Sequence, residues 1–334
     1  MLIDCFPGFN ELQLAEFRIR YLAELVDLVI IAESSLTHSG RHKSLHFSRW
    51  LESKPEFKNR VKVLEVSLSS ESTHWGREIA TRETLISCVA HEFPEGRFIL
   101  SDLDEIPSRK QIESFLKLHG NFHFITPSTY RYANWHLTDE QSSWKYGVMG
   151  NAELASLPNG GRMEKLPILI APDEGLHLSY LHHDSAKLEE KLTSFAHQEL
   201  NFPEMYTPAT LKFADDHRID HLGRFEKRGR GLLSQKALSE LSDLQLHALN
   251  FQPSWFNFDS QKLRQSRRKF ASLVITTLSR EKNVKRLIYR KFILHNKTNC
   301  LDTIRAYCAL LNTCISSYLM LFKHNLKIFY LKRF

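Results

Sequence analysis

The sequence lacks several features that would assign it to a specialised class of protein. Its five cysteines are scattered, without the spacing of a zinc site or a disulfide framework, and they fit a reduced compartment best. The opening residues, Met1-Leu2-Ile3-Asp4, show neither the basic nor the apolar segment of a secretory signal. Internal repeats and low-complexity segments are also absent from the sequence. We therefore expect a cytoplasmic globular protein.

A long apolar run is missing too. The strongest candidate, residues 306–322, holds 17 uncharged residues, whereas a membrane-spanning helix needs roughly 20 apolar ones. Its polar members fall on one arc of a helix and its apolar members on the other, which predicts an amphipathic helix. Such a helix can pack on the protein's own core or lie in a membrane interface, and the sequence leaves both options open.

Acidic residues are scarce at the C-terminal end. Residues 262–334 carry 17 Lys and Arg but only Glu281 and Asp302, a net charge of +15, whereas the whole chain has a net charge of +7. A basic segment on an acidic body suggests an anionic partner surface, such as the inner face of the plasma membrane. We predict a large globular domain over residues 1–258 and a basic, mainly helical extension over residues 259–334.

Strand-like and helix-like segments alternate along the first part of the chain. Apolar or alternating runs predict strands over residues 26–32, 60–66, 98–101 and 122–126, and helical periodicity predicts helices over residues 77–91 and 185–199. This alternation is typical of an α/β fold with a largely parallel sheet. Residues 130–175 show few clean periods, so we expect loops or irregular strands there.

Three carboxylates follow the strand predicted at residues 98–101. Residues 101–107 read Ser-Asp-Leu-Asp-Glu-Ile-Pro, so Asp102 and Asp104 project the same way if the strand geometry persists. Ligands of open α/β sheets bind at the carboxyl ends of strands, and Mg²⁺ and Mn²⁺ prefer carboxylate oxygens shared with phosphates. The motif thus predicts a metal–diphosphate site. Alternatively, the acids cap a helix that begins at Ser108, where Gln111 completes a capping box.

Several stretches together resemble glycosyltransferase family 17, whose animal member is the β-1,4-N-acetylglucosaminyltransferase that bisects N-glycans. The matching residues keep the family's order and are 4–6, 9–12, 26–27, 30–34, 37–40, 43–45, 75, 77–78, 82, 101–107, 175–179 and 191–199. The similarity fades after about residue 255. The sequence departs from the family at Leu176, where Trp is usual, and it lacks the transmembrane anchor and stem of the animal members.

The resemblance implies a GT-A type, Rossmann-like fold, with residues 1–258 as the catalytic domain. It implies a UDP-sugar donor, with N-acetylglucosamine as the best-known sugar, and inversion at the anomeric carbon. It also implies a divalent metal, manganese or magnesium, bound by Asp102 and Asp104. Asp102 can contact the ribose instead, and His177 is a candidate third metal ligand unless its role is structural.

Further charged residues qualify as contacts of such a donor. Glu33 ends the strand at residues 26–32, where it can contact the uridine or ribose, or cap the next segment. Arg77 and Arg82 can face the diphosphate because the guanidinium fork matches phosphate oxygens, or they can pair with neighbouring glutamates.

Inversion requires a base that takes the proton of the acceptor hydroxyl on the face opposite the leaving group. Asp173 and Glu174, just upstream of His177, and Glu199, within the matching stretch 191–199, are the candidates, and the sequence does not choose between them. The acceptor would be a glycan, with a lipid-linked glycan as one option. The enzyme would then work in the cytoplasm or as a peripheral protein on the inner face of the plasma membrane.

Two alternatives come from other classes of protein. A haloacid-dehalogenase-like phosphohydrolase also places Asp-x-Asp after a strand, and Asp215-Asp216 could be its later acids, but its motif normally follows the first strand and continues with Thr or Val where Ile106 stands. A nucleic-acid-binding protein would use the basic extension, where aromatic residues interleave with Lys and Arg. Because no nucleic-acid-binding motif accompanies them, we expect no nucleic-acid partner.

Overall fold

The structure is a computed structural model that describes residues 1–137, 143–181, 184–220, 222 and 232–258. The predicted extension over residues 259–334, with its amphipathic helix, lies outside the described residues, so its boundary stays a prediction. Within the described ranges, no helix is both long enough and apolar enough to cross a membrane.

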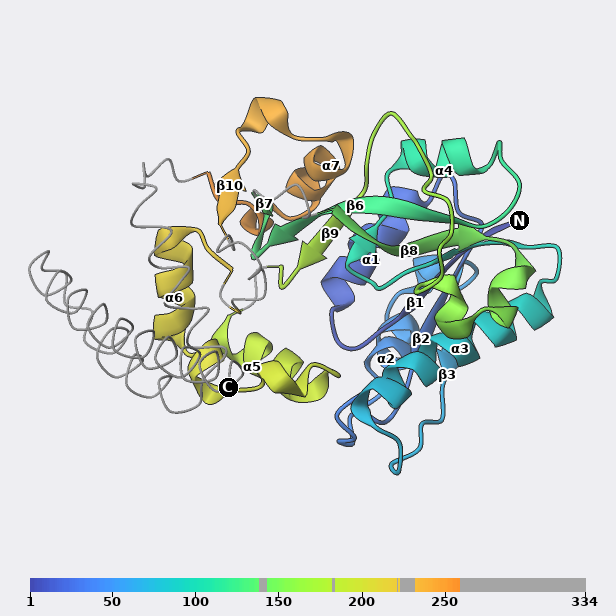
Figure 1. The fold of residues 1–334 in the computed structure, drawn as a ribbon, viewed down its shortest axis with the longest axis horizontal. Helices are drawn as coiled ribbons and strands as arrows, with labels where there is room; N and C mark the ends of the chain where they lie inside the picture. Colours follow the sequence, from blue (N-terminus) through green and yellow to red (C-terminus); the bar gives the residue numbers. More distant parts are fainter. Residues whose placement is uncertain (138–142, 182–183, 221, 223–231, 259–334) are drawn as a thin grey trace, which may run out of the picture.

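Four parallel strands form the first half of a ten-stranded sheet (Figure 1), and three of them were predicted, over residues 26–32, 60–66 and 98–101. They are β1 (Leu2–Pro7), β2 (Leu28–Glu33), β3 (Val61–Glu65) and β4 (Arg97–Leu100), and they lie in the order β3-β2-β1-β4. All six side chains of β2 are buried, which explains its nearly continuous apolar sequence. The prediction of an α/β fold with a parallel core is therefore confirmed.

The second half of the sheet runs antiparallel. From β4 it continues through β8 (Ser143–Gly150), β6 (Phe122–Tyr130), β7 (Tyr132–Leu137) and β10 (Leu233–Gln235). Two short strands lie off this path: β5 (Glu105–Ile106) pairs with β9 (Leu176–Ser179), which also runs parallel to β6. Residues 130–175, for which loops or irregular strands were expected, thus supply β7 and β8.

Helices cover both faces of the sheet, and alternate side chains of each strand face them. Leu2 and Phe6 of β1 join the core that includes α1 (Leu12–Leu22), α2 (His46–Glu52), α4 (Arg109–Phe115) and α7 (Asp243–Phe251). Ile3 and Cys5 of the same strand face α3 (His74–Glu92). This arrangement leaves the carboxyl ends of the parallel strands at one edge of the sheet.

A second apolar cluster surrounds α5 (Ser185–Ser194) and α6 (Pro208–His217), together with β7 and β10. The helix predicted over residues 185–199 ends at Ser194, and residues 198–200 form a 3-10 helix instead. Further 3-10 helices are Pro55–Phe57, Ala152–Ser156, Pro158–Gly161, Pro203–Tyr206, Leu238–Glu240 and Pro253–Trp255. Figure 1 shows α5 and α6 on the side of the molecule away from α3 and β3.

Candidate active site

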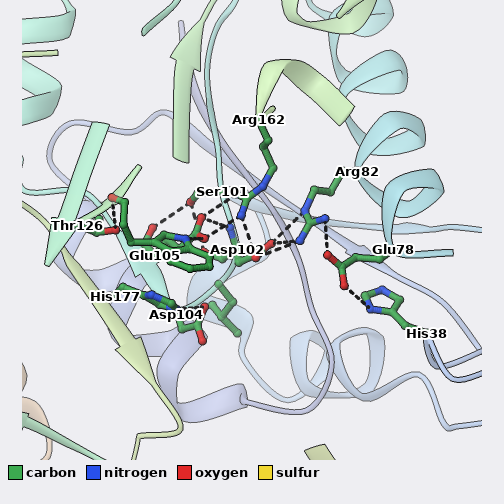
Figure 2. A network of polar contacts seen from close by, with 12 residues as sticks. His38, Glu78, Arg82, Ser101, Asp102, Asp104, Glu105, Thr126, Arg162 and His177 are labelled. Carbon is green, nitrogen blue, oxygen red and sulfur yellow. Dashed lines mark hydrogen bonds and ion pairs between the residues drawn. The ribbon is translucent and has the colours of Figure 1, made fainter. Parts of the chain in front are cut away.

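The acidic motif forms a turn beyond β4, at the carboxyl edge of the parallel strands. The amide of Glu105 donates to the carbonyl of Asp102 at 2.9 Å, and β5 then begins at Glu105. Leu103 points into the core, whereas Asp102 and Asp104 stay partly exposed. Because a turn replaces the strand geometry on which the common direction of the two Asp side chains depended, their carboxylates meet different partners (Figure 2).

A buried arginine holds this turn from the core side. The guanidinium of Arg18, from α1, binds both carboxylate oxygens of Asp4 at 2.5 and 2.8 Å. It also donates to the hydroxyl of Ser101 at 2.9 Å and to the carbonyl oxygens of Asp102, Leu103 and Glu105 at 2.8–3.3 Å. The Arg18 and Asp4 side chains are both fully buried, so the turn is fixed by an ion pair that water does not reach.

Asp102 is bound by two arginines. Arg82, from α3, donates to both of its carboxylate oxygens at 2.7–3.1 Å, and Arg162 donates to Oδ2 at 3.2 Å. Burial raises the pKa of Asp102, but the charges of Arg162 and Arg82 lower it further than burial raises it, so the pKa lies well below its usual value. The protein itself therefore neutralises this carboxylate.

Asp104 has a different environment. Its Oδ1 lies 3.8 Å from Nε2 of His177 and its Oδ2 lies 3.6 Å from Nζ of Lys191. Burial raises the pKa of Asp104, and the charges of Lys191 and His177 do not fully offset that effect. Asp104 is therefore the acid of the motif whose charge is least well compensated, and it faces two cationic or metal-binding groups.

Strand pairing brings His177 to Asp104. In the register of β5 with β9, Glu105 lies opposite His177, which also lies beside Ser128 of β6. Nδ1 of His177 is 3.4 Å from the hydroxyl of Ser128, and its ring lies 4.8 Å from the ring of Trp144. These contacts orient the imidazole so that Nε2 points toward Asp104, as a second contact orients many metal-binding histidines (Figure 2).

Glu105 anchors the site rather than lining it. Its fully buried carboxylate pairs with Arg162 at 2.7 and 2.8 Å and accepts the amide of Asp102 at 2.9 Å. It also accepts a hydrogen bond from the indole N–H of Trp144. Arg162 thus joins Asp102 and Glu105 from outside the motif (Figure 2).

The two arginines expected near a diphosphate are both bound to groups of the protein. Arg82 binds Glu78 at 2.9 Å as well as Asp102. Arg77 donates to backbone carbonyls, at 2.8 Å for His38 and 3.2 Å for Ser70. The structure thus places Arg82 beside the acidic motif but commits Arg77 to holding two loops together.

Glu33 caps the segment that follows it. Both of its carboxylate oxygens accept amides at the start of α2, from His46, Phe47 and Ser48, and Lys43 pairs with it at 3.2 Å. Glu33 is fully buried, so this carboxylate is saturated by contacts within the protein. Of the two roles considered for Glu33, a contact with the donor or a cap on the next segment, the contacts in the structure are those of a cap.

The two candidate bases differ in their surroundings. Glu174 is exposed on the loop before β9, although partial burial of its carboxyl, followed by the charge of Asp173, raises its pKa. Glu199 lies in the 3-10 helix Gln198–Leu200 after α5 and pairs with Nδ1 of His197 at 2.5 Å. The ring of His197 in turn contacts the ring of Trp75 at 4.6 Å.

A backbone contact joins the end of α5 to the loop after β2. The amide of Ser39 donates to the carbonyl of Ser194 at 2.9 Å, and the ring of Phe195 lies 4.9 Å from Nζ of Lys191. Burial lowers the pKa of His38 to about 4 despite the opposing charges of Glu78 and Asp102, so the neutral imidazole of His38 borders the same region. Glu199 thus follows α5, the helix whose Lys191 lies 3.6 Å from Asp104.

Sequence reasoning missed four residues of the site: Arg18, Trp144, Arg162 and Lys191. Arg18 could have been noticed as a basic residue on the apolar face of α1. Lys191 opens a stretch that matches the family. For Trp144 and Arg162, the sequence between residues 130 and 175 gave no clear pattern.

A metal ion at this site would take some of its ligands from the protein and the others from the substrate. In the part of the chain that the structure describes, no three His, Cys, Asp or Glu side chains are grouped to hold a metal ion. Asp104 and His177 nevertheless present an oxygen and a nitrogen 3.8 Å apart. Metal–ligand bonds of about 2.1 Å place two ligands of one ion roughly 3–4 Å apart, so this pair fits a divalent ion completed by phosphate oxygens.

Comparison with known proteins gives one strong match. The model of glycosyltransferase family 17 matches residues 2–212. No curated protein matches the chain. Among solved structures, HddC from Yersinia pseudotuberculosis is similar at 13% identity, with 52% of this chain and 87% of that chain covered and a TM-score of 0.30. The same protein complexed with GMP-PN gives 12% identity, 52% and 86% coverage and a TM-score of 0.30.

Proposed function

This chain belongs to glycosyltransferase family 17, and from that premise we propose that it is an inverting, metal-dependent transferase. It would move a sugar, N-acetylglucosamine in the first instance, from a UDP-sugar to a hydroxyl of a glycan. The observation that carries the proposal is the environment of Asp104. This carboxylate lies at the carboxyl edge of the parallel strands, has a raised pKa and faces His177 and Lys191. Such a carboxylate is suited to bind a cation.

Asp104 and His177 would hold the divalent ion, together with oxygens of the donor diphosphate. The ion would supply positive charge beside the leaving group. Asp102 would act differently, because Arg82 and Arg162 already occupy both of its oxygens. We propose that this ion cluster shapes the donor site and gives Asp102 a position from which it can contact the ribose.

The transfer itself needs a proton acceptor. The acceptor oxygen attacks the anomeric carbon, the bond from that carbon to the β-phosphate oxygen breaks, and UDP leaves with the electron pair. The hydroxyl proton passes to the base. We propose Glu199 for this role, because it is exposed, is paired with His197 and lies in the short 3-10 helix that follows α5, the helix that carries Lys191. Glu174 instead follows Asp173, whose carbonyl oxygen accepts a hydrogen bond from the hydroxyl of Ser108 at the start of α4.

We predict that Glu199→Gln lowers sugar transfer by about 10²- to 10⁴-fold, the usual contribution of general base catalysis. UDP affinity should change little, because the base acts on the acceptor. Initial rates and calorimetric titration with UDP measure the two effects. The matched control is Glu174→Gln, which removes an exposed carboxylate from the other candidate position. If Glu174→Gln abolishes transfer and Glu199→Gln does not, the assignment is reversed.

The function as a whole can be tested by a donor screen. The full-length protein is incubated with UDP-, GDP-, ADP- and CMP-sugars plus Mn²⁺, and release of the nucleotide is followed with and without oligosaccharide acceptors. We expect turnover of UDP-sugars, highest with UDP-N-acetylglucosamine, and a product with inverted anomeric configuration. Turnover restricted to another nucleotide, or retention of configuration, would contradict the proposal.

The acceptor side remains a proposal from the sequence. The basic residues from position 262 onward favour an anionic membrane surface as a partner, and a lipid-linked glycan would be presented there.

The acids considered for the alternative function, a phosphohydrolase, are paired within the protein. Asp215 binds Arg131 at 2.6 and 2.8 Å, and Asp216 pairs with Lys212 at 2.8 Å. This pairing, together with family membership, leaves the transferase as the better supported function.

A further inference from the structure

Lys191 is a buried ammonium group in the centre of the candidate site. Its side chain is 8% exposed, and its Nζ lies 3.2 Å from Oε1 of Glu11 and 3.6 Å from Oδ2 of Asp104. The aromatic rings of Tyr180 and Phe195 also lie beside it, at 5.0 and 4.9 Å from Nζ. Two carboxylates and two aromatic rings therefore surround the ammonium.

Two backbone features lie near Lys191. Tyr180, directly after β9, adopts a φ of 54°, which is unfavourable for a residue with a side chain. At the other end, the carbonyl of Ser194 accepts the amide of Ser39 at 2.9 Å and ties the end of α5 to the loop after β2. Strain that persists beside a site is typical of a group whose position matters.

Lys191 differs from the other cations of the site in what it binds. Arg82 and Arg162 each bind carboxylates through two or more hydrogen bonds, and Arg77 binds backbone carbonyls. The ammonium of Lys191 has three N–H donors, and Glu11 accepts one of them within the residues described by the structure. Asp104 is close enough for an ion pair but lies beyond hydrogen-bond distance. The group therefore retains donors on the side of Asp104.

We propose that Lys191 binds the β-phosphate of the donor diphosphate directly, beside Asp104. This inference rests on the proposed function. A lysine ammonium is a compact charge that suits a phosphate oxygen, and this one lies beside the acid that would bring the diphosphate into the site through a divalent ion. As the bond from the sugar to the β-phosphate breaks, negative charge grows on that phosphate, and Lys191 would stabilise it.

The competing explanation is that Lys191 is only a clamp between α1, the acidic turn and α5. The two explanations differ in what they predict for UDP and UMP, which share the uridine and the α-phosphate but differ in the β-phosphate. A clamp affects both nucleotides alike. A direct contact with the β-phosphate affects UDP alone.

The experiment is calorimetric titration of the full-length protein with UDP and with UMP, at saturating Mn²⁺. We expect the wild type to prefer UDP, and Lys191→Met to lower UDP affinity by about 10- to 100-fold and UMP affinity by less than about threefold, as for loss of a charged hydrogen bond. The matched control is Lys187→Met, an exposed lysine on the same helix, which should change neither affinity.

Other outcomes decide against the inference. Equal losses for UDP and UMP, or no loss for either, would overturn it, and so would a wild type that binds both nucleotides equally well. If Lys191→Met does not fold, the acetylation rate of Lys191 in the wild type replaces it: UDP should slow that rate more than UMP does, and equal rates would overturn the inference. A wild type that binds no uridine nucleotide refutes the proposed function itself.

Discussion

Replacing Asp104 by alanine should lower sugar transfer by at least about 10³-fold, as expected when the group that localises charge at the leaving phosphate is lost. The fold should survive. Burial raises the pKa of Asp104, so its ionised form is less favourable in the folded chain than in the unfolded one. Removing such a carboxylate near pH 7 should leave the melting temperature unchanged or raise it. Lys191 keeps Glu11 as a partner.

Activity and thermal unfolding of Asp104→Ala, measured side by side, test this expectation. The control is Asp216→Ala, which removes an aspartate whose side chain is 43% exposed and pairs with exposed Lys212, and which should leave both quantities unchanged. The wild type should lose its transfer activity in excess chelator and recover it with Mn²⁺ or Mg²⁺. Full activity of the wild type in excess chelator would falsify the metal-dependent mechanism.

The largest loss of stability is expected for Arg18→Met. Its guanidinium neutralises fully buried Asp4 and binds three carbonyls of the acidic turn. Removing one partner of a buried ion pair leaves the other charge without compensation, which costs about 3–5 kcal/mol. We expect a loss of this size in the free energy of unfolding, measured by urea denaturation.

Two further variants separate the buried charge from a general effect on α1. Arg20→Met removes an arginine of the same helix that is 47% exposed and pairs with Glu16 and Glu56, and it should cost no more than about 1 kcal/mol. The double variant Asp4→Asn with Arg18→Met removes both charges and should recover part of the loss. If Arg18→Met is as mild as Arg20→Met, the turn is held by other contacts.

The sequence predicted those elements whose local residue pattern matches their surroundings in the folded protein. The strand β2 is apolar because helices cover both of its faces, and Ser108 with Gln111 forms the predicted capping box at the start of α4. The antiparallel half of the sheet could not be predicted, because strands such as β7 mix polar and aromatic residues that pack only in the assembled sheet. Their pairing depends on partners distant in the sequence.

The same distinction applies to the candidate site. The sequence identified Asp102 and Asp104, since an acidic motif after an apolar strand is a local signal. It could not tell which carboxylate is already neutralised, because Arg82 and Arg162 are 20 and 60 residues away from Asp102. For Glu33, the sequence allowed both a ligand and a cap, and only the position of α2 distinguishes them.

The pairing of Glu105 with Arg162 has a consequence for the order of events during synthesis. When residues 1–120 have left the ribosome, the parallel strands can already associate, yet Glu105 still lacks the arginine that follows it by 57 residues. Lys191 arrives later still. A nascent chain of this length therefore carries two carboxylates, Asp104 and Glu105, without their cationic partners, and contacts of such high sequence separation form slowly. We expect the acidic turn to be the last part of the parallel half to become ordered.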